Sequence, residues 1–290
     1  WPVDARERGH NNEGMGVTRG PARAAAKAIR HRAIPVILHT CSRGRTLDLE
    51  SARLLVVERG CFDRAENERI YRKFFATVPR SFLQIVDGYG HAEKRVVDDG
   101  CGYGHYLIHF GPGSVGLDAN EKSRQFAISL GLEVLHCNVE EGIPLPRDSY
   151  KAAWCANLLE HMVAPHLLLG RLHRILVPDG LLVAKVPVIP PWPVRHGVRL
   201  LGRPLGYEAS EHINAFTPAT FAFTLERAGF RVVESTSIVL RNPLLQAISA
   251  PFTKRFGASI TVVARKDPSF VYPQKRLAAF DPGWMEEGFR

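Results

Sequence analysis

A glycine-rich run in the first half of the chain constrains the fold more than any other feature of the sequence. Within residues 95–104 an apolar pair is followed by an acid and by glycine at every second position, in the order Asp98-x-Gly100-x-Gly102-x-Gly104. Glycine tolerates positive φ and has no Cβ, so this pattern predicts a buried strand that ends in a turn close to a ligand. A side chain at Gly100 or Gly102 would fill the space that the ligand needs.

The residues around this turn limit which kind of ligand can bind there. Residues 104–110 predict a helix, whose backbone N–H groups would point at the ligand. The spacing differs from the Gly-x-Gly-x-x-Gly pattern of dinucleotide-binding proteins, which disfavours NAD. A second apolar run ends in Asp118, about 20 residues after Asp98, where a nucleotide-binding α/β unit places the carboxylate that binds a ribose diol.

Apolar runs alternate with helical patterns along the rest of the chain. Predicted strands lie near 94–99, 114–118, 133–137, 150–156, 180–187, 231–239 and 258–265, and predicted helices near 104–110, 120–130, 163–175 and 217–229. Such alternation predicts an α/β fold with a mainly parallel sheet covered on both faces. Helical patterns over 23–30 and over 62–86, the second interrupted by Pro79, predict an N-terminal helical extension.

Three motifs in this order resemble the class I S-adenosylmethionine-dependent methyltransferases, in particular the branch with the ubiquinone-biosynthesis O-methyltransferases and related small-molecule methyltransferases. They are the glycine turn, Leu159-Glu160-His161 after the fourth strand, and Leu176-Val-Pro-Asp-Gly180 before the fifth. The resemblance covers roughly residues 90–240. It implies a Rossmann-like, seven-stranded, mostly parallel sheet in which the seventh strand inserts antiparallel beside the sixth. It also implies S-adenosylmethionine as the cofactor.

The resemblance assigns the cofactor site residue by residue. It places the methionine part of the cofactor over the glycine turn, with Asp98 at its amino end and Asp118 at both ribose hydroxyls. The adenine would contact Asn138, whose side-chain oxygen can bond its amino group although the family often has Asp there. The family's usual acid near the start of the fourth strand is Lys151 here, a departure that we assign to a surface contact. The full predicted set is Asp98, Gly100, Cys101, Gly102, Gly104, Asp118, Ala119, Asn138, Val139 and Asn157.

Glu160, His161 and His212 are the candidate catalytic residues. Methyl transfer from a sulfonium is an in-line displacement, so the protein mainly positions donor and acceptor and excludes water. His212 lies in a His-x-x-x-Phe-Thr-Pro segment common in this branch. As a neutral imidazole it can take the acceptor proton; the alternative is a histidine that ties its loop to the next helix.

The resemblance associates the adjacent Glu160 and His161 with a metal or with acceptor binding. We assign no metal, and the alternative for Glu160 is a carboxylate stabilised at a helix start. Neighbours on a helix point in different directions, so we expect the two side chains to diverge.

The chain divides into three predicted parts: a basic extension, partly disordered or helical, over residues 1–60, a methyltransferase domain over 61–266 with a cap insertion at 188–216, and an irregular tail over 267–290. The aromatic residues Tyr71, Phe74 and Phe75 in the helical pattern over 62–86 are candidates for a lid over the site; the alternative is that they pack on the sheet. Aromatic and arginine residues in the cap, including Trp192 and Arg195, suggest a planar or anionic acceptor.

Composition limits the partners. None of the apolar runs reaches the ~18 residues of a membrane span. The five cysteines include no Cys-x-x-Cys pair, which favours buried thiols in a reducing cytoplasm over zinc. The net charge of +9 is concentrated in the N-terminal segment, as a docking surface or as a solvated arm.

We therefore predict methyl transfer to an oxygen or nitrogen of a small or lipid-like metabolite. The alternatives are an RNA- or protein-directed methyltransferase that uses the basic arm, and a catalytically silent cofactor-binding module. The Asn-Pro-Pro-Tyr type of motif is absent after the fourth strand, which disfavours methylation of nucleic-acid bases.

Overall fold

The computed structural model describes residues 49–190, 192–200, 205–238 and 259–270. The expectations for residues 1–48, for the insertion at 241–256 and for most of the tail lie outside these ranges.

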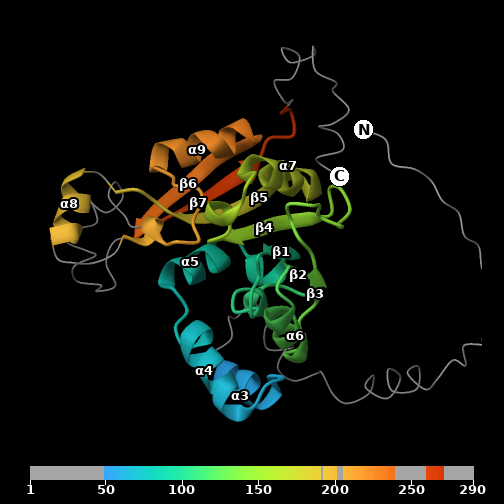
Figure 1. Cartoon of the computed structure of the whole chain (residues 1–290). Helices are drawn as coiled ribbons and strands as arrows, with labels where there is room; N and C mark the ends of the chain where they lie inside the picture. The colour runs from blue at the N-terminus through green and yellow to red at the C-terminus, as the bar shows by residue number, and fades with distance from the viewer. Residues whose placement is uncertain (1–48, 191, 201–204, 239–258, 271–290) are drawn as a thin grey trace, which may run out of the picture. The chain divides into compact units, whose positions relative to one another are not determined.

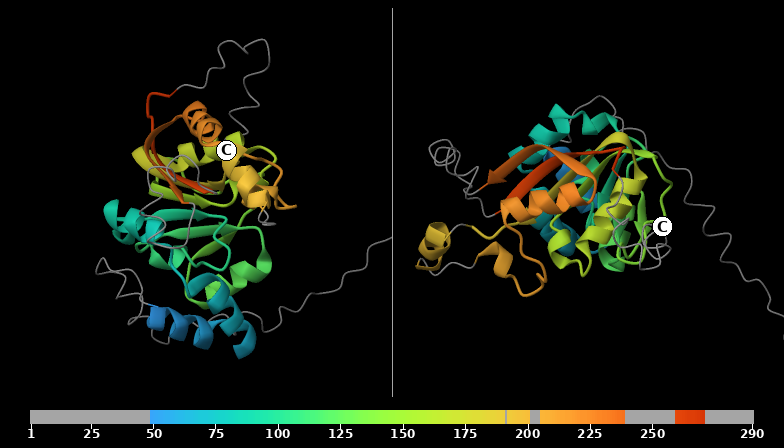
Figure 2. Two further views of the ribbon diagram at one scale, coloured as in Figure 1. Left: turned by 90° about the vertical axis from the view of Figure 1, so that its left-hand side faces the viewer. Right: turned by 90° about the horizontal axis from the view of Figure 1, so that it is seen from above.

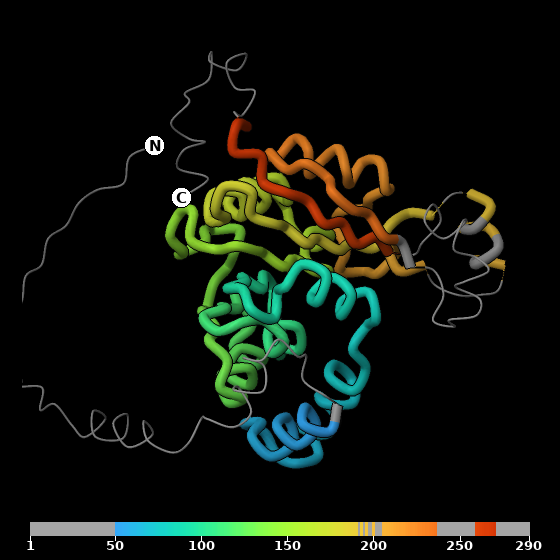
Figure 3. Tube along the Cα trace, turned by 180° about the vertical axis from the view of Figure 1, so that it is seen from behind, coloured from blue at the N-terminus to red at the C-terminus, as the bar shows by residue number. Residues whose placement is uncertain are grey.

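A seven-stranded sheet forms the core, in the order β3-β2-β1-β4-β5-β7-β6. The strands are β1 (Val96–Asp99), β2 (Val115–Asp118), β3 (Val134–His136), β4 (Tyr150–Ala156), β5 (Leu176–Pro187), β6 (Phe230–Ile238) and β7 (Ser259–Lys266). β1 to β5 pair in parallel, whereas β7 is antiparallel to both β5 and β6. Figure 3 shows β7 in red beside β6 in orange. The predicted sheet, including its antiparallel seventh strand, is confirmed.

Helices cover both faces of this sheet (Figures 1 and 2). The long ones are α5 (Arg80–Gly88), α6 (Glu121–Ser129), α7 (Pro165–Ile175) and α9 (Pro218–Arg227). α7 and α9 bury Leu172 and Phe221 against one face, and α5 buries Phe82 against the other. The sequence predicts the start of α9 well, because Thr217 is its N-cap and Pro218 its first residue.

The segment before α5 is mainly helical where the structure describes it. It consists of α3 (Leu49–Arg59), α4 (Arg64–Ile70) and the π-helix η1 (Tyr71–Phe75), and α5 starts after Pro79 as predicted. The sequence analysis missed α3, because its apolar residues do not recur at a helical period. Leu55 and Val56 of α3 nevertheless pack in a cluster with Phe126 of α6.

The predicted helix over 104–110 is wrong. Only a 3₁₀ turn, η3 (Leu107–His109), follows the glycine turn. Gly111 explains the early stop: its N–H donates to the carbonyls of His91 and Lys94, and a Cβ there would lie 2.6 Å from the Lys94 backbone. The chain must therefore turn away before a second helical turn forms.

Short elements complete the fold. They are η2 (His91–Glu93), η4 (Leu159–His161), α8 (Trp192–Leu200) and η5 (Gly206–Glu208). Val188 pairs with Phe216 in an isolated bridge, so the predicted cap at 188–216 leaves and rejoins the core at one point. α8 stands apart from the sheet in Figures 1 and 2. In the described ranges no helix is both long and apolar enough to cross a bilayer.

Candidate functional site

The glycine turn follows β1 at the carboxyl end of the parallel strands, where α/β proteins bind ligands. Gly100, Gly102 and Gly104 all have positive φ (70°, 54° and 83°), as predicted. A Cβ at Gly102 would meet no atom within 4 Å, so open space lies beside this residue. At Gly104 it would lie 2.5 Å from a methyl group of Leu132, and at Gly100 3.1 Å from one of Leu158. The expectation of ligand space is therefore wrong at Gly100, where the neighbour is a leucine side chain.

Asp98 is 2% exposed, and one of its carboxyl oxygens, Oδ2, has no hydrogen-bond partner among the described residues. The Leu107 N–H, which was expected to face the ligand, hydrogen bonds to this carboxyl group instead. Burial, together with the neighbouring Asp99 and Asp118, raises the pKa of Asp98 well above its usual range. A buried carboxyl oxygen without a donor is suited to bind a ligand ammonium group.

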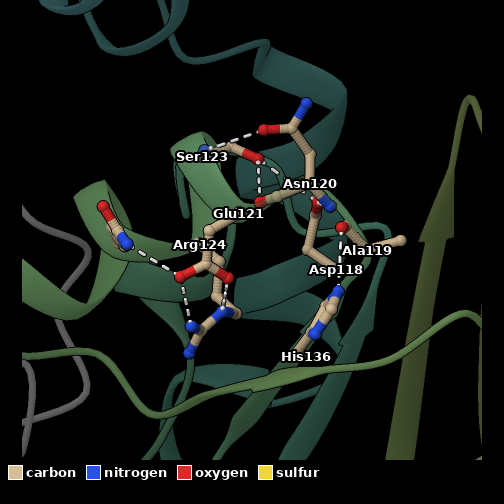
Figure 4. Close-up of polar contacts among 8 residues, drawn as sticks. Asp118, Ala119, Asn120, Glu121, Ser123, Arg124 and His136 are labelled. Carbon is tan, nitrogen blue, oxygen red and sulfur yellow. Dashed lines mark hydrogen bonds and ion pairs between the residues drawn. The ribbon is translucent and has the colours of Figure 1, made fainter.

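Asp118, drawn in Figure 4, ends β2, and its carboxylate links this strand to the glycine turn. Its Oδ2 accepts the Gly102 N–H at 2.7 Å, and its Oδ1 accepts the Asn120 N–H at 2.7 Å. The Ser123 hydroxyl lies 3.2 Å from Oδ1 and 3.1 Å from the Asn120 carbonyl, so its single proton can go to either. When it goes to Asn120, each carboxylate oxygen keeps one free lone pair, as binding of two ribose hydroxyls requires.

The residues beyond β2 and β3 have partners of their own. His136 Nε2 lies 3.1 Å from the Ala119 carbonyl (Figure 4). The Asn138 oxygen, which the sequence analysis assigned to the adenine, accepts the Glu140 N–H at 3.2 Å and so closes its own turn. The Val139 carbonyl accepts from Arg171 at 2.5 Å. Asn138 is exposed and its oxygen retains a second lone pair, so its predicted role remains a prediction.

Buried cysteines lie in and beside the strands, as expected. Cys101, Cys137 and Cys155 are buried free thiols, and burial raises the pKa of each. Their thiolate forms are therefore disfavoured, which is consistent with a packing role.

The chain leaves β4 through a strained residue. Asn157 has φ +55°, a conformation that asparagine tolerates better than most residues, and its N–H donates to the Lys185 carbonyl at 2.8 Å. The next residue, Leu158, is the one that approaches Gly100. The segment after β4 therefore borders the glycine turn.

A segment of the cap docks on this region. The Glu160 carbonyl accepts the N–H groups of Ile213 and Asn214, at 3.0 and 2.9 Å. The Asn214 side-chain amide donates to the carbonyls of Leu159 and Met162. These bonds hold the residues that flank His212 against η4.

Glu160, His161 and His212 consequently meet. One ligand atom from each lies within 4.8 Å of the other two, and the imidazole centroids are 4.8 Å apart. The expectation that Glu160 and His161 diverge is wrong, because they lie in a three-residue 3₁₀ turn and not in an α-helix. Burial raises the pKa of Glu160, and His161, His212 and Lys185 partly offset this. The cluster combines two imidazoles with one buried carboxyl group.

Of the three lid candidates, Phe74 and Phe75 contact residues at the glycine turn, Phe75 through a T-shaped contact with His105 at 6.3 Å between ring centroids, and Phe74 makes the closer contacts. Its ring lies 5.0 Å from that of Tyr103 and 5.8 Å from that of His105. Tyr71 and Phe75 are buried in the cluster formed by α3, α4 and α6.

Three residues near the site were not predicted from the sequence: Ser123, His136 and Lys185. Ser123 and His136 carry no motif, and only their contacts with Asp118 and Ala119 reveal them. Lys185 had a visible signal, a cation inside the apolar run of β5.

Comparisons with known proteins identify the family. A family model for a methyltransferase domain matches residues 67–235, more than half of the chain. The chain belongs to this family. The resemblance to class I S-adenosylmethionine-dependent methyltransferases is thereby confirmed.

Individual relatives agree with the family. The uncharacterized methyltransferase YcgJ of Bacillus subtilis (strain 168) is 30% identical over 127 residues, or 40% of this chain and 50% of that protein. The match thus spans half the length of this curated relative. A chain from the complex between the Haloferax volcanii Trm112 methyltransferase activator and a methyltransferase superposes with a TM-score of 0.50 at 20% identity, covering 74% of this chain and 99% of that one. A SAM-dependent methyltransferase from Archaeoglobus fulgidus gives 0.50 at 18% identity, with 69% and 99% covered. These two structures support the fold.

S-adenosylmethionine is the cofactor of this family, and the residues present fit it. Asp98 has a buried oxygen without a donor among the described residues, which fits the ammonium group of the cofactor. The open space beside Gly102 fits the sulfonium chain. The free lone pairs of the Asp118 carboxylate fit the ribose hydroxyls.

Proposed function

We propose that this chain transfers the methyl group of S-adenosylmethionine to an oxygen or nitrogen of a small or lipid-like metabolite by in-line displacement. The meeting of Glu160, His161 and His212 carries the proposal. Two segments separated by 50 residues in sequence build this cluster, and it lies beside the glycine turn. An acceptor held there would be close to the cofactor.

The protein's task is to position the acceptor and to receive its proton. When bound, the cofactor supplies a methyl group already activated by a sulfonium. Asp98, the backbone at Gly102 and Asp118 hold the cofactor in this proposal. His212 accepts the proton, and its Nδ1 is buried with no hydrogen-bond partner in the described part of the chain. Glu160 beside it stabilises the imidazolium that forms.

His161 positions the cluster. Its Nδ1 lies 3.0 Å from the Glu211 carbonyl. Because a carbonyl only accepts, Nδ1 is the donor in this bond. The bond ties the loop that carries His212 to η4.

The same three ligand atoms favour a second arrangement. Their 4.8 Å cluster of one carboxyl oxygen and two imidazole nitrogens is a donor set that a divalent ion can use. Such an ion would be held by Glu160, His161 and His212 and would polarise the acceptor. We predict no metal, and transfer that survives exhaustive chelation would support this.

A transfer assay with methyl-labelled cofactor tests the function. The full chain is incubated with separated metabolite, lipid, RNA and protein fractions, and the label in each is measured. Label in the metabolite or lipid fraction, lost in His212→Asn, supports the proposal. Label in the RNA or protein fraction would refute it in favour of a macromolecular acceptor. Cofactor binding without transfer to any fraction would favour the silent module.

A further inference from the structure

Lys185 occupies an unusual place for a lysine. It lies near the carboxyl end of β5, within the run Leu181 to Val186, where every other residue is apolar and buried. It pairs with Ala156 of β4 on one side and with Thr261 of β7 on the other. The side chain is partly buried at the strand end where the cofactor site and the cluster of Glu160, His161 and His212 lie.

The ammonium group of Lys185 lacks a hydrogen-bond partner among the described residues. In the described ranges, Lys185 Nζ makes neither a hydrogen bond nor an ion pair. The charged and titratable groups that act on it are Glu160 and His105. Burial lowers the pKa of Lys185, and the nearby Glu160 partly offsets this effect. A cation at this depth therefore has one carboxyl group in range and no direct partner.

A buried lysine in the neighbouring strand shows how a lysine of this sheet forms hydrogen bonds within the chain. Lys266, in the neighbouring strand β7, is 6% exposed, and its Nζ donates to Asp148 Oδ1 at 2.6 Å and to the Leu176 carbonyl at 2.5 Å. Lys185 lies inside an apolar strand and Lys266 ends one, but of the two only Lys266 has a hydrogen-bond partner among the described residues. Because a partly buried ammonium without a hydrogen-bond partner has lost part of its hydration, Lys185 is suited to a partner that comes with a ligand.

We propose that Lys185 binds an oxyanionic group, a carboxylate or a phosphate, on the methyl acceptor. This inference rests on the proposed function and narrows its substrate to acidic small molecules. Charge-assisted hydrogen bonds from Nζ to the oxyanion would hold the acceptor between β5 and the histidine cluster. Lys185 is thus a specificity residue, and Glu160 keeps the charge of the empty site partly balanced.

Titration calorimetry on the full chain tests this. S-adenosylmethionine and S-adenosylhomocysteine are titrated first, into wild type and into Lys185→Met, Lys185→Gln and Lys185→Arg. The matched control Lys151→Met removes an exposed lysine from β4. Equal cofactor affinities show that the variants are folded. Benzoate, phenyl phosphate and neutral benzamide are then titrated into each complex with S-adenosylhomocysteine.

We expect at least one anion to bind wild type and to bind Lys185→Met and Lys185→Gln about tenfold more weakly or worse, the loss that follows from removing a charged hydrogen bond. Lys185→Arg and Lys151→Met should bind it nearly as wild type does, and benzamide should not distinguish the variants. The anion that binds wild type more tightly indicates whether the oxyanionic group of the acceptor is a carboxylate or a phosphate.

Three results would overturn the inference. The first is an anion affinity that is the same with and without Lys185, and the second is no anion binding by a wild type that binds the cofactor. The third is weaker cofactor binding in both neutral variants, which would assign Lys185 to the cofactor. Absence of cofactor binding by wild type would instead refute the proposed function.

Discussion

Asp99 makes the stability of the protein depend on pH in a way that one substitution can isolate. It is the last residue of β1, is 0% exposed, and pairs in register with Leu117 of β2 and Cys155 of β4. Among the described residues its side-chain partner is the Cys155 thiol, a weak donor. Burial, assisted by Asp118 and opposed by the Cys155 thiol, raises the pKa of Asp99 from 3.8 to about 7.

The sign and size follow from proton linkage. Between these two values the native state holds a proton on Asp99 that the unfolded chain releases, so the free energy of unfolding falls as pH rises. The contribution is fully present below pH 4 and is lost by the time pH has passed about 7. Three pKa units at 1.36 kcal/mol each set an upper limit of about 4 kcal/mol. Asp99→Asn keeps the shape of the side chain but does not titrate.

Urea unfolding at pH 5, 6, 7 and 8, followed by circular dichroism, measures the effect. The unfolding free energy of Asp99→Asn minus that of wild type should grow with pH, by up to about 3 kcal/mol between pH 5 and pH 8, because about two of the three pKa units lie in this window. Burial lowers the pKa of His91, His105 and His109 to about 4, which makes stability rise with pH, but this cancels in the difference. The exposed Asp87→Asn is the control and should stay parallel to wild type. Parallel curves for Asp99→Asn as well would refute the reasoning.

Three further predictions concern the site. Asp118→Ala should weaken S-adenosylmethionine binding roughly a hundredfold in calorimetry, because it removes two charge-assisted hydrogen bonds; unchanged affinity would contradict the ribose assignment. Gly102→Ala should weaken cofactor binding more than Gly131→Ala, since both residues have positive φ and open space but only Gly102 faces the proposed ligand; equal affinities would argue against the site. His212→Asn should lower kcat by 10²–10⁴ with little change in cofactor affinity, and a rate equal to wild type in the transfer assay would exclude His212 as the base.

Local sequence patterns were sufficient to predict those elements whose structure depends on neighbouring residues. The strands were predictable because parallel strands buried on both faces read as apolar runs, and β4 was predicted at its observed bounds. Pro79 separates η1 from α5, and Thr217 caps α9, because each acts on the residues next to it. The positive φ of the three alternating glycines likewise follows from the residue type.

The predicted helix after the glycine turn failed for a reason that sequence patterns do not show. Leu107 and Gly111 use their backbone N–H groups on Asp98 and on the η2 region, which lie elsewhere in the chain. These long-range partners compete with helical hydrogen bonds. Helix α3 was not predicted because its apolar residues follow no helical period, and its stability comes from packing against other helices.

The sequence by itself determined the alternation of strands and helices of an α/β fold, the glycine turn and the two acids that the proposed cofactor site uses, because these depend on residue type and short spacing. Only the tertiary structure decided how the site is completed. The docking of Asn214 on η4 brings His212 to Glu160 and His161. The pairing of β4, β5 and β7 places Lys185 within electrostatic range of Glu160 but without a hydrogen-bond partner among the described residues. Both outcomes depend on contacts between segments far apart in the chain, and one sequence read alone does not reveal which of its distant residues will meet.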